Sequence, residues 1–311
     1  MRLPNFFIVG APKCGTTALY HSLRQHPEVF LPYSKEEYWR YKEPFHFCSD
    51  LGLADWLRVS DEGEYAALFE PAGDASKSGE ATAWYLYSPE AGPRIKQRCG
   101  PDTKIIIMLR PPVAWMRSWH HDLLRYGYED IGDFREALNA EDARGRGERM
   151  PARAVFSGCL CYRKAARFSG QVERMFQLFG RGNVFVGLME DLARGQEDFV
   201  AEVLRFLDVD DSIRLKPERE NDSAVLRGTH LFDLKVSRAF DRLPGGGIVK
   251  KLWASGPERV YSAVVDKSLP PLSDKSIDPA LERELREEFR DEVNALSELL
   301  GRDLSHWNKP K

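Results

Sequence analysis

The chain has 311 residues, of which 42% are hydrophobic and 30% are charged, and its formal net charge is −3. This composition is that of an ordinary globular protein, long enough for one large α/β domain or two small ones. The slightly negative charge argues against a nucleic-acid-binding protein that depends on a general positive field. Any anionic ligand must therefore be met by local basic residues.

The cysteines argue against a disulfide-linked or metal-binding protein, and the hydropathy argues against a secreted or membrane-spanning one. The five cysteines are odd in number and have neither metal-site nor disulfide-framework spacing, so we expect reduced thiols and no metal: Cys14, Cys48, Cys99, Cys159 and Cys161. We find no signal peptide before the first apolar run and no apolar run long enough to cross a bilayer. We therefore expect a soluble, cytoplasmic protein.

The first predicted elements form a strand, a loop and a helix. Asn5–Val9 is a short apolar run, the loop begins at Gly10, and Thr16–Gln25 has the apolar spacing of a helix. Backbone N–H groups and the positive end of the helix dipole then face the loop, which is the arrangement of a phosphate cradle. A strand–loop–helix turn without a ligand is the alternative at this point.

The loop differs from a Walker A motif in the place of its lysine. Gly10 and Gly15 have the required spacing, but Thr16 follows Gly15 where a Walker A loop has lysine, and Lys13 lies inside the loop. A γ-phosphate–Mg²⁺ site is poorly provided for. The loop therefore predicts nucleotide binding without NTPase activity. Cys14 is either a thiolate activated by the helix N-terminus or a small residue that the loop tolerates.

A second strand and helix add another anion-binding candidate. Lys104–Leu109 is a continuous β-prone run, as expected of a central parallel strand. Arg110 follows at its carboxyl end, where open α/β sheets bind ligands. Prolines open the next helix, Pro112–Arg125, and Ser118 lies about two turns along it. The hydroxyl of Ser118 and the Arg110 fork are therefore candidates for one phosphate.

The remaining pattern is that of one α/β domain over residues 1–311. A third strand is predicted at Asn183–Leu188, and helices separate the strands, so the sheet should be parallel with crossover helices. Residues 140–152 are charged and contain glycine, which predicts a mobile surface loop. The other predicted helices are Pro89–Cys99, Tyr162–Phe179, Glu197–Leu207 and Pro279–Leu300.

With Lys13 in Pro-Lys-x-Gly-Thr-Thr, and with Arg110 eight residues before Ser118, the chain resembles sulfotransferases that use 3′-phosphoadenosine 5′-phosphosulfate (PAPS). It is most similar to the bacterial, heparan-sulfate-sulfotransferase-like branch. The resemblance extends from about Asn5 to Trp307 and includes three further stretches, at 79–89, 189–192 and 299–307. It implies a P-loop-like three-layer fold with a central parallel sheet flanked by helices.

The resemblance also implies how the donor is bound. Lys13 would contact the oxygen that bridges phosphate and sulfate, Arg110 and Ser118 would hold the 3′-phosphate, and Arg227 in a late loop would add a basic contact. The product would be 3′-phosphoadenosine 5′-phosphate (PAP), and no metal would be required. The loop residues expected around the 5′-phosphosulfate are Pro12, Lys13, Cys14, Gly15, Thr16 and Thr17.

Sulfuryl transfer also needs a base for the acceptor proton, which in this branch is a glutamate of a Lys-Glu-Pro-His-Phe-Phe-like segment. Two segments qualify, one containing Glu36 and the other, Lys42 to Phe47, containing Glu43. We favour Glu43 because Pro44 follows it, which makes residues 34–40 a local insertion. His46 is a third candidate by its ordinary pKa, although Phe45 displaces it by one position and a structural role is favoured.

The sequence thus predicts direct transfer of a sulfuryl group to a hydroxyl, or less readily an amine, of a small-molecule, lipid or sugar acceptor, as in natural product biosynthesis. A P-loop kinase or NTPase is the first alternative, but the best strand ends in Arg110 rather than in a Walker B carboxylate. A non-catalytic nucleotide-binding protein of the same fold is the second, and Glu43 and Glu36 argue against it.

Overall fold

The computed structural model describes residues 3–54, 57–151, 154–215 and 277–309. Arg227 lies outside the described residues. The described chain contains a five-stranded sheet in the order β2-β3-β1-β4-β5, and all its neighbouring strands are parallel. The strands are β1 (Phe6–Gly10), β2 (Val29–Phe30), β3 (Lys77–Glu80), β4 (Lys104–Leu109) and β5 (Val184–Leu188).

The two central strands are apolar on both faces because helices cover both sides of the sheet. Every residue of β1 is buried, and in β4 every residue after Lys104 is buried. Phe6 pairs with Lys104 and Ile8 with Ile106, and the register then shifts between Ile8 and Gly10. The predicted central strands are therefore confirmed.

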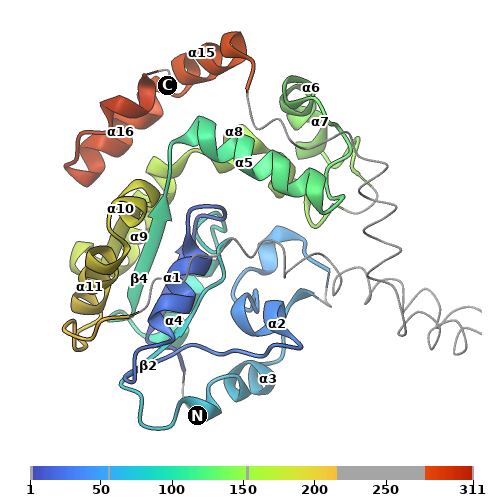
Figure 1. The fold of residues 1–311 in the computed structure, drawn as a ribbon. Coiled ribbons are helices and arrows are strands. Elements are labelled where there is room, and N and C mark those ends of the chain that lie inside the picture. Colours follow the sequence, from blue (N-terminus) through green and yellow to red (C-terminus); the bar gives the residue numbers. More distant parts are fainter. Residues whose placement is uncertain (1–2, 55–56, 152–153, 216–276, 310–311) are drawn as a thin grey trace, which may run out of the picture.

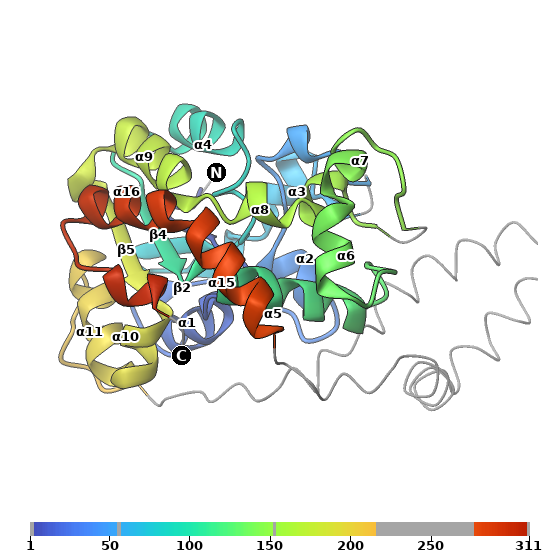
Figure 2. The same ribbon diagram turned by 90° about the horizontal axis from the view of Figure 1, so that it is seen from above.

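Helices form a layer on each side of the sheet (Figure 2). One layer holds α4, α9 and α16, in which α9 packs against α4, α16 and both β4 and β5. The other holds α1, α10 and α11, with α1 against β1 and α11. These helices are α1 (Thr16–Leu23), α4 (Ala91–Cys99), α9 (Phe168–Phe179), α10 (Met189–Arg194), α11 (Gln196–Phe206) and α16 (Arg290–Leu300).

Helix α5 (Pro112–Arg125) lies across the carboxyl end of the sheet, above the tip of β4 (Figure 1). The strand order makes this edge the switch point, because the chain leaves β1 toward the β2 edge and leaves β4 toward β5. Ligands of open α/β sheets bind in the crevice at such a point. The loop after β1 and Arg110 after β4 therefore emerge side by side.

Two long predicted helices are each divided in the structure. Tyr162–Phe179 becomes α8 (Tyr162–Ala165) and α9, and Pro279–Leu300 becomes α15 (Pro279–Glu288) and α16, separated by Phe289. The second break has a packing reason, since α15 contacts α5 whereas α16 contacts α9, and the buried Phe289 lies between them. Periodicity alone does not reveal such a change of direction.

Strands β2 and β3 were not predicted, because β2 has only two residues and β3 lacks an apolar run. In β3 the sequence is Lys-Ser-Gly-Glu, and a Cβ atom at Gly79 would lie 2.1 Å from the ring of Phe6. Close approach to β1 therefore selects glycine rather than a β-branched residue. Five helices of the described chain were also not predicted: α2 (Tyr38–Lys42), α3 (Glu62–Ala67), α6 (Phe134–Asn139), α7 (Glu141–Gly145) and α10.

The segment 140–152 is partly helical, since it contains α7. Arg144 in this helix is fully buried and donates two hydrogen bonds to Glu129, at 2.5 and 2.6 Å. The hydroxyl of Tyr162 donates to the same carboxylate at 2.5 Å. The sequence did not predict this anchor, because arginine is rarely fully buried and the paired acid lies 15 residues away. Mobility of the segment stays a prediction.

Candidate active site

The loop between β1 and α1 has the backbone of an anion cradle. Lys13 and Gly15 have left-handed φ angles of 61° and 87°, and Gly15 precedes the first turn of α1, which has no side-chain cap and no acidic residue. A Cβ atom at Gly10 would lie 2.7 Å from the Ala83 carbonyl oxygen, so this glycine is required by space as well. Uncapped N–H groups at a helix start favour a negative charge.

Lys13 forms an ion pair with a residue that the sequence had not singled out. Its Nζ atom lies 2.7 Å from Oδ1 of Asp122 on α5, and the two side chains are 32% and 17% exposed. Asp122 follows Ser118 by one helical turn, so both lie on the same face of α5. The face that contains Ser118 is therefore turned toward the cradle loop.

Arg110 is joined to the same loop. Its guanidinium NH1 donates to the carbonyl oxygen of Lys13 at 3.1 Å, and the indole Nε1 of Trp115 donates to the carbonyl oxygen of Pro12 at 2.7 Å. The buried Nε atom of Arg110 has no hydrogen-bond partner in the described chain. Burial lowers the pKa of Arg110, as expected of a cation without a carboxylate beside it. An anion at this position would satisfy both the charge and the unpaired N–H group.

Cys14 is a fully buried residue of this loop. Burial raises the pKa of its thiol to about 12, although the nearby Arg110 charge opposes the shift. The side chain is therefore a neutral thiol at pH 7. Of the two interpretations of Cys14, this favours the small tolerated residue over the activated thiolate.

Glu43 is placed by the end of α2. The helix stops at Lys42, and the buried Lys42 ammonium lies 2.7 Å from Oε1 of Glu43, whose side chain is 12% exposed. The same ammonium lies 5.8 Å from the ring centroid of Tyr20 on α1. Glu43 is thus a half-buried carboxylate beside a fixed cation and near the helix that begins at the cradle.

Glu36 and His46 have different surroundings. Glu36 is exposed, and its carboxylate accepts a hydrogen bond from the Ser34 hydroxyl at 3.3 Å. His46 is buried, with Nδ1 2.7 Å from the Val59 carbonyl oxygen and its ring stacked on Tyr65 at 4.0 Å. Burial lowers the pKa of His46, so the ring is neutral at pH 7. These contacts support a structural role for His46.

A strained turn follows Glu43. Phe45 has a φ angle of 52°, which residues other than glycine rarely adopt. Its N–H group donates to the Thr82 hydroxyl at 3.3 Å, and the N–H group of Phe47 donates to the Tyr85 hydroxyl at 3.2 Å. The extra residue before His46 is therefore accommodated by this turn, which the segment after β3 holds in place.

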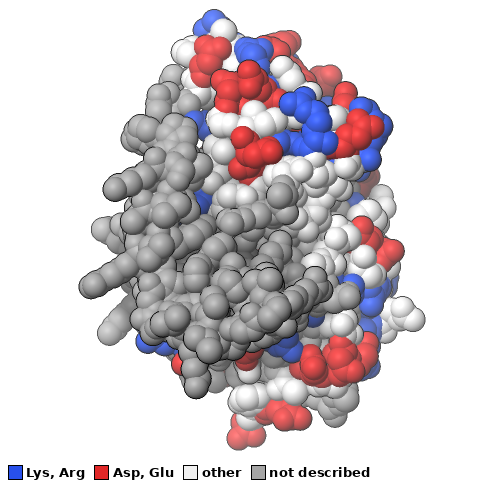
Figure 3. Space-filling view, turned by 90° about the vertical axis from the view of Figure 1, so that its right-hand side faces the viewer, with Lys and Arg blue, Asp and Glu red and all other residues white. Residues whose placement is uncertain are grey.

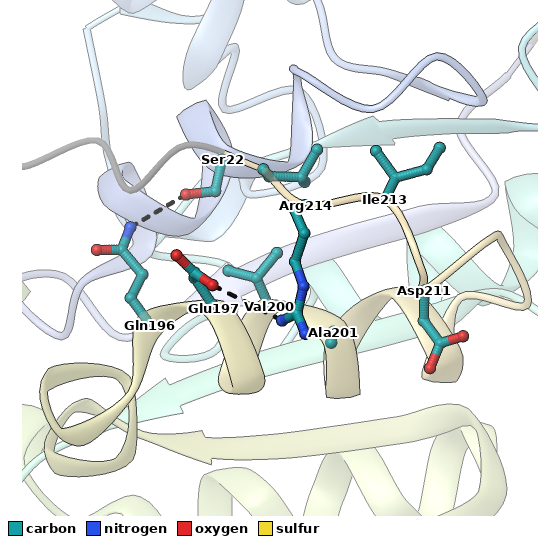
Figure 4. Close-up of a pocket in the computed structure, with 9 residues that line it drawn as sticks. Ser22, Gln196, Glu197, Val200, Ala201, Asp211, Ile213 and Arg214 are labelled. Carbon is teal, nitrogen blue, oxygen red and sulfur yellow. Dashed lines mark hydrogen bonds and ion pairs between the residues drawn. The ribbon is translucent and has the colours of Figure 1, made fainter.

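Other features of the surface do not compete with this site. A pocket between α1 and α11 is lined by apolar side chains and by polar groups that already pair, Gln196 with Ser22 at 3.2 Å and Arg214 with Glu197 at 3.6 Å (Figure 4). In the described part of the face in Figure 3, basic and acidic side chains are interspersed rather than gathered by sign. Among the described residues, no group of three or more His, Cys, Asp or Glu side chains could hold a metal.

The fold is that of a P-loop-like α/β protein, and the loops after β1 and β4 bring the cations Lys13 and Arg110 to its switch point. Residues 4–212 match the model of the sulfotransferase family. The chain therefore belongs to the sulfotransferase family. A sulfotransferase from Alicyclobacillus acidocaldarius has a similar structure over 99% of this chain and 100% of its own, with a TM-score of 0.70 and 28% identity.

Curated relatives match a smaller part of the chain. Human carbohydrate sulfotransferase 15 is 42% identical over 151 residues, which is 37% of this chain and 26% of the relative. Mouse heparan sulfate glucosamine 3-O-sulfotransferase 6 is 37% identical over 113 residues, 36% of this chain and 28% of the relative. The chain thus spans about a quarter of the length of these relatives. No helix of the described chain has both the length and the apolar character of a membrane span.

Proposed function

We propose that the protein transfers the sulfuryl group of PAPS directly to a hydroxyl group, as an enzyme of the 2.8.2 class. The observation that carries the proposal is the hydrogen bond from Arg110 to the Lys13 carbonyl oxygen. It joins two cationic segments at the switch point of a sulfotransferase-family fold. A ligand with two separate anionic groups suits this arrangement better than one with a single phosphate.

In this proposal each anionic group of the donor is bound by a different set of residues. The cradle from Pro12 to Thr17 would bind the 5′-phosphosulfate through N–H and hydroxyl groups, with Lys13 beside the bridging oxygen. Arg110, with its unpaired Nε, and Ser118 would bind the 3′-phosphate. PAPS supplies an already activated sulfuryl group, so these residues have to bind, orient and neutralise charge. The contact from Arg227 stays a prediction, and no metal is part of the proposal.

Glu43 is the base in this proposal, rather than Glu36 or His46. Its carboxylate is half-buried and beside the Lys42 cation, near α1. Glu36 is exposed to solvent, and His46 is buried with Nδ1 on the Val59 carbonyl oxygen and its ring stacked on Tyr65. A positioned carboxylate that accepts the proton of the attacking hydroxyl contributes about 10²–10⁴-fold to a rate.

The acceptor in this proposal is a hydroxyl of a small molecule, a lipid or a sugar. The names of the two curated relatives describe transfer to carbohydrate, in one case to an oxygen of glucosamine. They support an oxygen acceptor rather than an amine. A bacterial, heparan-sulfotransferase-like origin, a cytoplasmic location and a role in natural product biosynthesis are further parts of the prediction from the sequence.

Incubation with radiolabelled PAPS and a panel of phenols, sugars, lipids and amines tests this function. We expect transfer of label to at least one hydroxyl compound in the presence of a metal chelator. ATP with Mg²⁺ is the matched alternative donor, and phosphoryl transfer from it would favour a kinase. Binding of PAP without transfer to any acceptor class would favour a non-catalytic nucleotide-binding protein.

A further inference from the structure

Glu80 is a buried carboxylate with no role in the function proposed above. It is the last residue of β3, pairs in register with Phe7 of β1, and is 1% exposed. No lysine or arginine among the described residues forms a hydrogen bond or an ion pair with Glu80. A buried acid without a cation is costly, so its surroundings must satisfy it by hydrogen bonds.

Hydroxyl groups provide these hydrogen bonds. Tyr65 donates to Oε2 of Glu80 at 2.6 Å, and Thr82 donates to Oε1 at 2.5 Å. The Tyr85 hydroxyl is a further neighbour of the carboxylate and opposes the rise of its pKa. An ionised carboxylate accepts from both Tyr65 and Thr82, whereas a protonated one must itself donate to one of them, which leaves the proton of that hydroxyl without this acceptor.

Two of these hydroxyl groups also hold the turn after the proposed base. Thr82 accepts from the N–H group of Phe45, and Tyr85 accepts from that of Phe47. Because the Thr82 hydroxyl has one proton, donating it to Glu80 leaves the lone pairs of the Thr82 oxygen to accept from the Phe45 N–H group. The carboxylate therefore orients the acceptor that fixes the left-handed Phe45 and, through it, Glu43 two residues earlier.

We propose that Glu80 is a positioning residue for the proposed sulfuryl transfer, in which its ionised form holds the turn at residues 45–47 and thereby places the Glu43 carboxylate. The inference depends on the proposed function for its effect on turnover. Its structural part, the link from Glu80 through Thr82 to the Phe45 amide, does not depend on it.

The link is expected to respond to pH. Burial is the main reason that the pKa of Glu80 is raised to about 7, against the three hydroxyl groups, and the Glu43 carboxylate adds to the shift. The other titratable groups around Glu80 are Tyr65, Tyr85, Cys48 and Cys99, and burial raises the pKa of each. These four stay neutral near pH 7, so the carboxylate itself changes charge there.

Glu80→Gln tests the link with the least change of shape. The amide NH₂ of glutamine must donate, so one hydroxyl group reverses its direction and the turn loosens. We expect kcat to fall about tenfold, with the PAPS KM changed less than about twofold, because the donor cradle is untouched. In the wild type, kcat should rise with pH through about 7, and the variant should lack this rise. An unchanged kcat, or the same rise in the variant, would overturn the proposal.

Thr82→Val covers the case in which Glu80→Gln does not fold. Valine preserves the shape of threonine but removes the hydroxyl between Glu80 and the Phe45 amide. Hydrogen exchange of the Phe45 amide, measured by NMR on the free protein, should become about tenfold faster. The matched control is Thr103→Val, a buried threonine before β4 at the opposite end of the sheet. Equal Phe45 exchange in wild type and Thr82→Val would contradict the link.

Sulfuryl transfer and Phe45 amide exchange together distinguish failure of the proposed function from failure of the positioning role of Glu80. If the wild type transfers no sulfuryl group to any acceptor but Phe45 exchange responds to Thr82→Val, then the proposed function is wrong and the structural link holds. If the wild type is active and neither variant affects kcat or the Phe45 amide, then the positioning role of Glu80 is wrong.

Discussion

The ammonium group of Lys13 lies 2.7 Å from the carboxylate of Asp122, across the space between the cradle loop and α5. In the proposed reaction this ammonium has to neutralise charge on the donor. Donor binding must therefore exchange one partner of Lys13 for another, or share the ammonium between them. Asp122 thus contributes a negative charge next to a site that is proposed to bind an anion.

Asp122→Asn should bind PAP more tightly than the wild type. The substitution preserves the size of the side chain and removes a negative charge beside Lys13. Because the pair is partly exposed, we expect an increase in affinity of about three- to tenfold, measured by calorimetry. Asp102→Asn, an exposed carboxylate before β4, is the control with the same charge change. Weaker binding by Asp122→Asn would mean that Asp122 helps to hold Lys13 in its binding position.

Glu43→Gln should retain PAP binding and lose turnover by at least about 10²-fold, because an amide cannot accept the acceptor proton. Glu36→Gln is the matched control, since its carboxylate is exposed and hydrogen-bonded only locally among the described residues. Steady-state rates with an acceptor identified in the panel provide the measurement. Full activity of Glu43→Gln together with an inactive Glu36→Gln would reverse the assignment of the base.

Gly10→Ala should destabilise the fold and the cradle together. A Cβ atom there would lie 2.7 Å from a backbone carbonyl oxygen, and the φ angle of 154° is one that side chains rarely adopt. We expect the free energy of unfolding in urea to fall by about 1–3 kcal/mol. Gly170→Ala in α9 has open space at its Cβ, so it should instead stabilise by about 0.5–1 kcal/mol. Equal stabilities of the two variants would contradict the geometry of the loop.

Glu80 should make the protein less stable as the pH rises. Its folded-state pKa of about 7 lies above the ordinary value of 4.5, so the folded state retains its proton between these values while the unfolded state loses it. The stability of the wild type relative to Glu80→Gln should therefore fall on the order of 3 kcal/mol between pH 4 and pH 8. Urea titrations of both proteins at several pH values test this. If the stability difference between the two proteins stays constant with pH, then the pKa of Glu80 is not raised by folding and the carboxylate is solvated.

The sequence predicted the parts of the fold and the site that depend on local patterns. The buried runs of β1 and β4, the glycines of the cradle and the helix from Pro112 to Arg125 each have a signal within a few residues. Arg110 was predicted at the carboxyl end of a central parallel strand, and it does follow β4. Its hydrogen bond to the Lys13 carbonyl oxygen shows that it lies beside the loop; the roles of these residues toward a donor stay predictions.

The parts that were not predicted depend on contacts between distant segments. Asp122 is one helical turn after Ser118, which is a usable signal only once Lys13 is known to face that helix. Glu80 belongs to a stretch noted for its family resemblance, but its partner Tyr65 and the turn at Phe45, which Thr82 contacts, come from other parts of the chain. Strand β3 itself was missed because glycine and polar residues replace an apolar run where Phe6 fills the space.

Calorimetric titration of PAP into the wild type, Lys13→Ala and Arg110→Ala measures whether the two segments bind the nucleotide. We expect saturable binding to the wild type without added metal. We expect a loss of affinity of at least about tenfold in each variant, because each removes a charge-assisted contact. No heat of binding to the wild type, or wild-type affinity in both variants, would contradict the claim that these two segments together bind a doubly phosphorylated nucleotide.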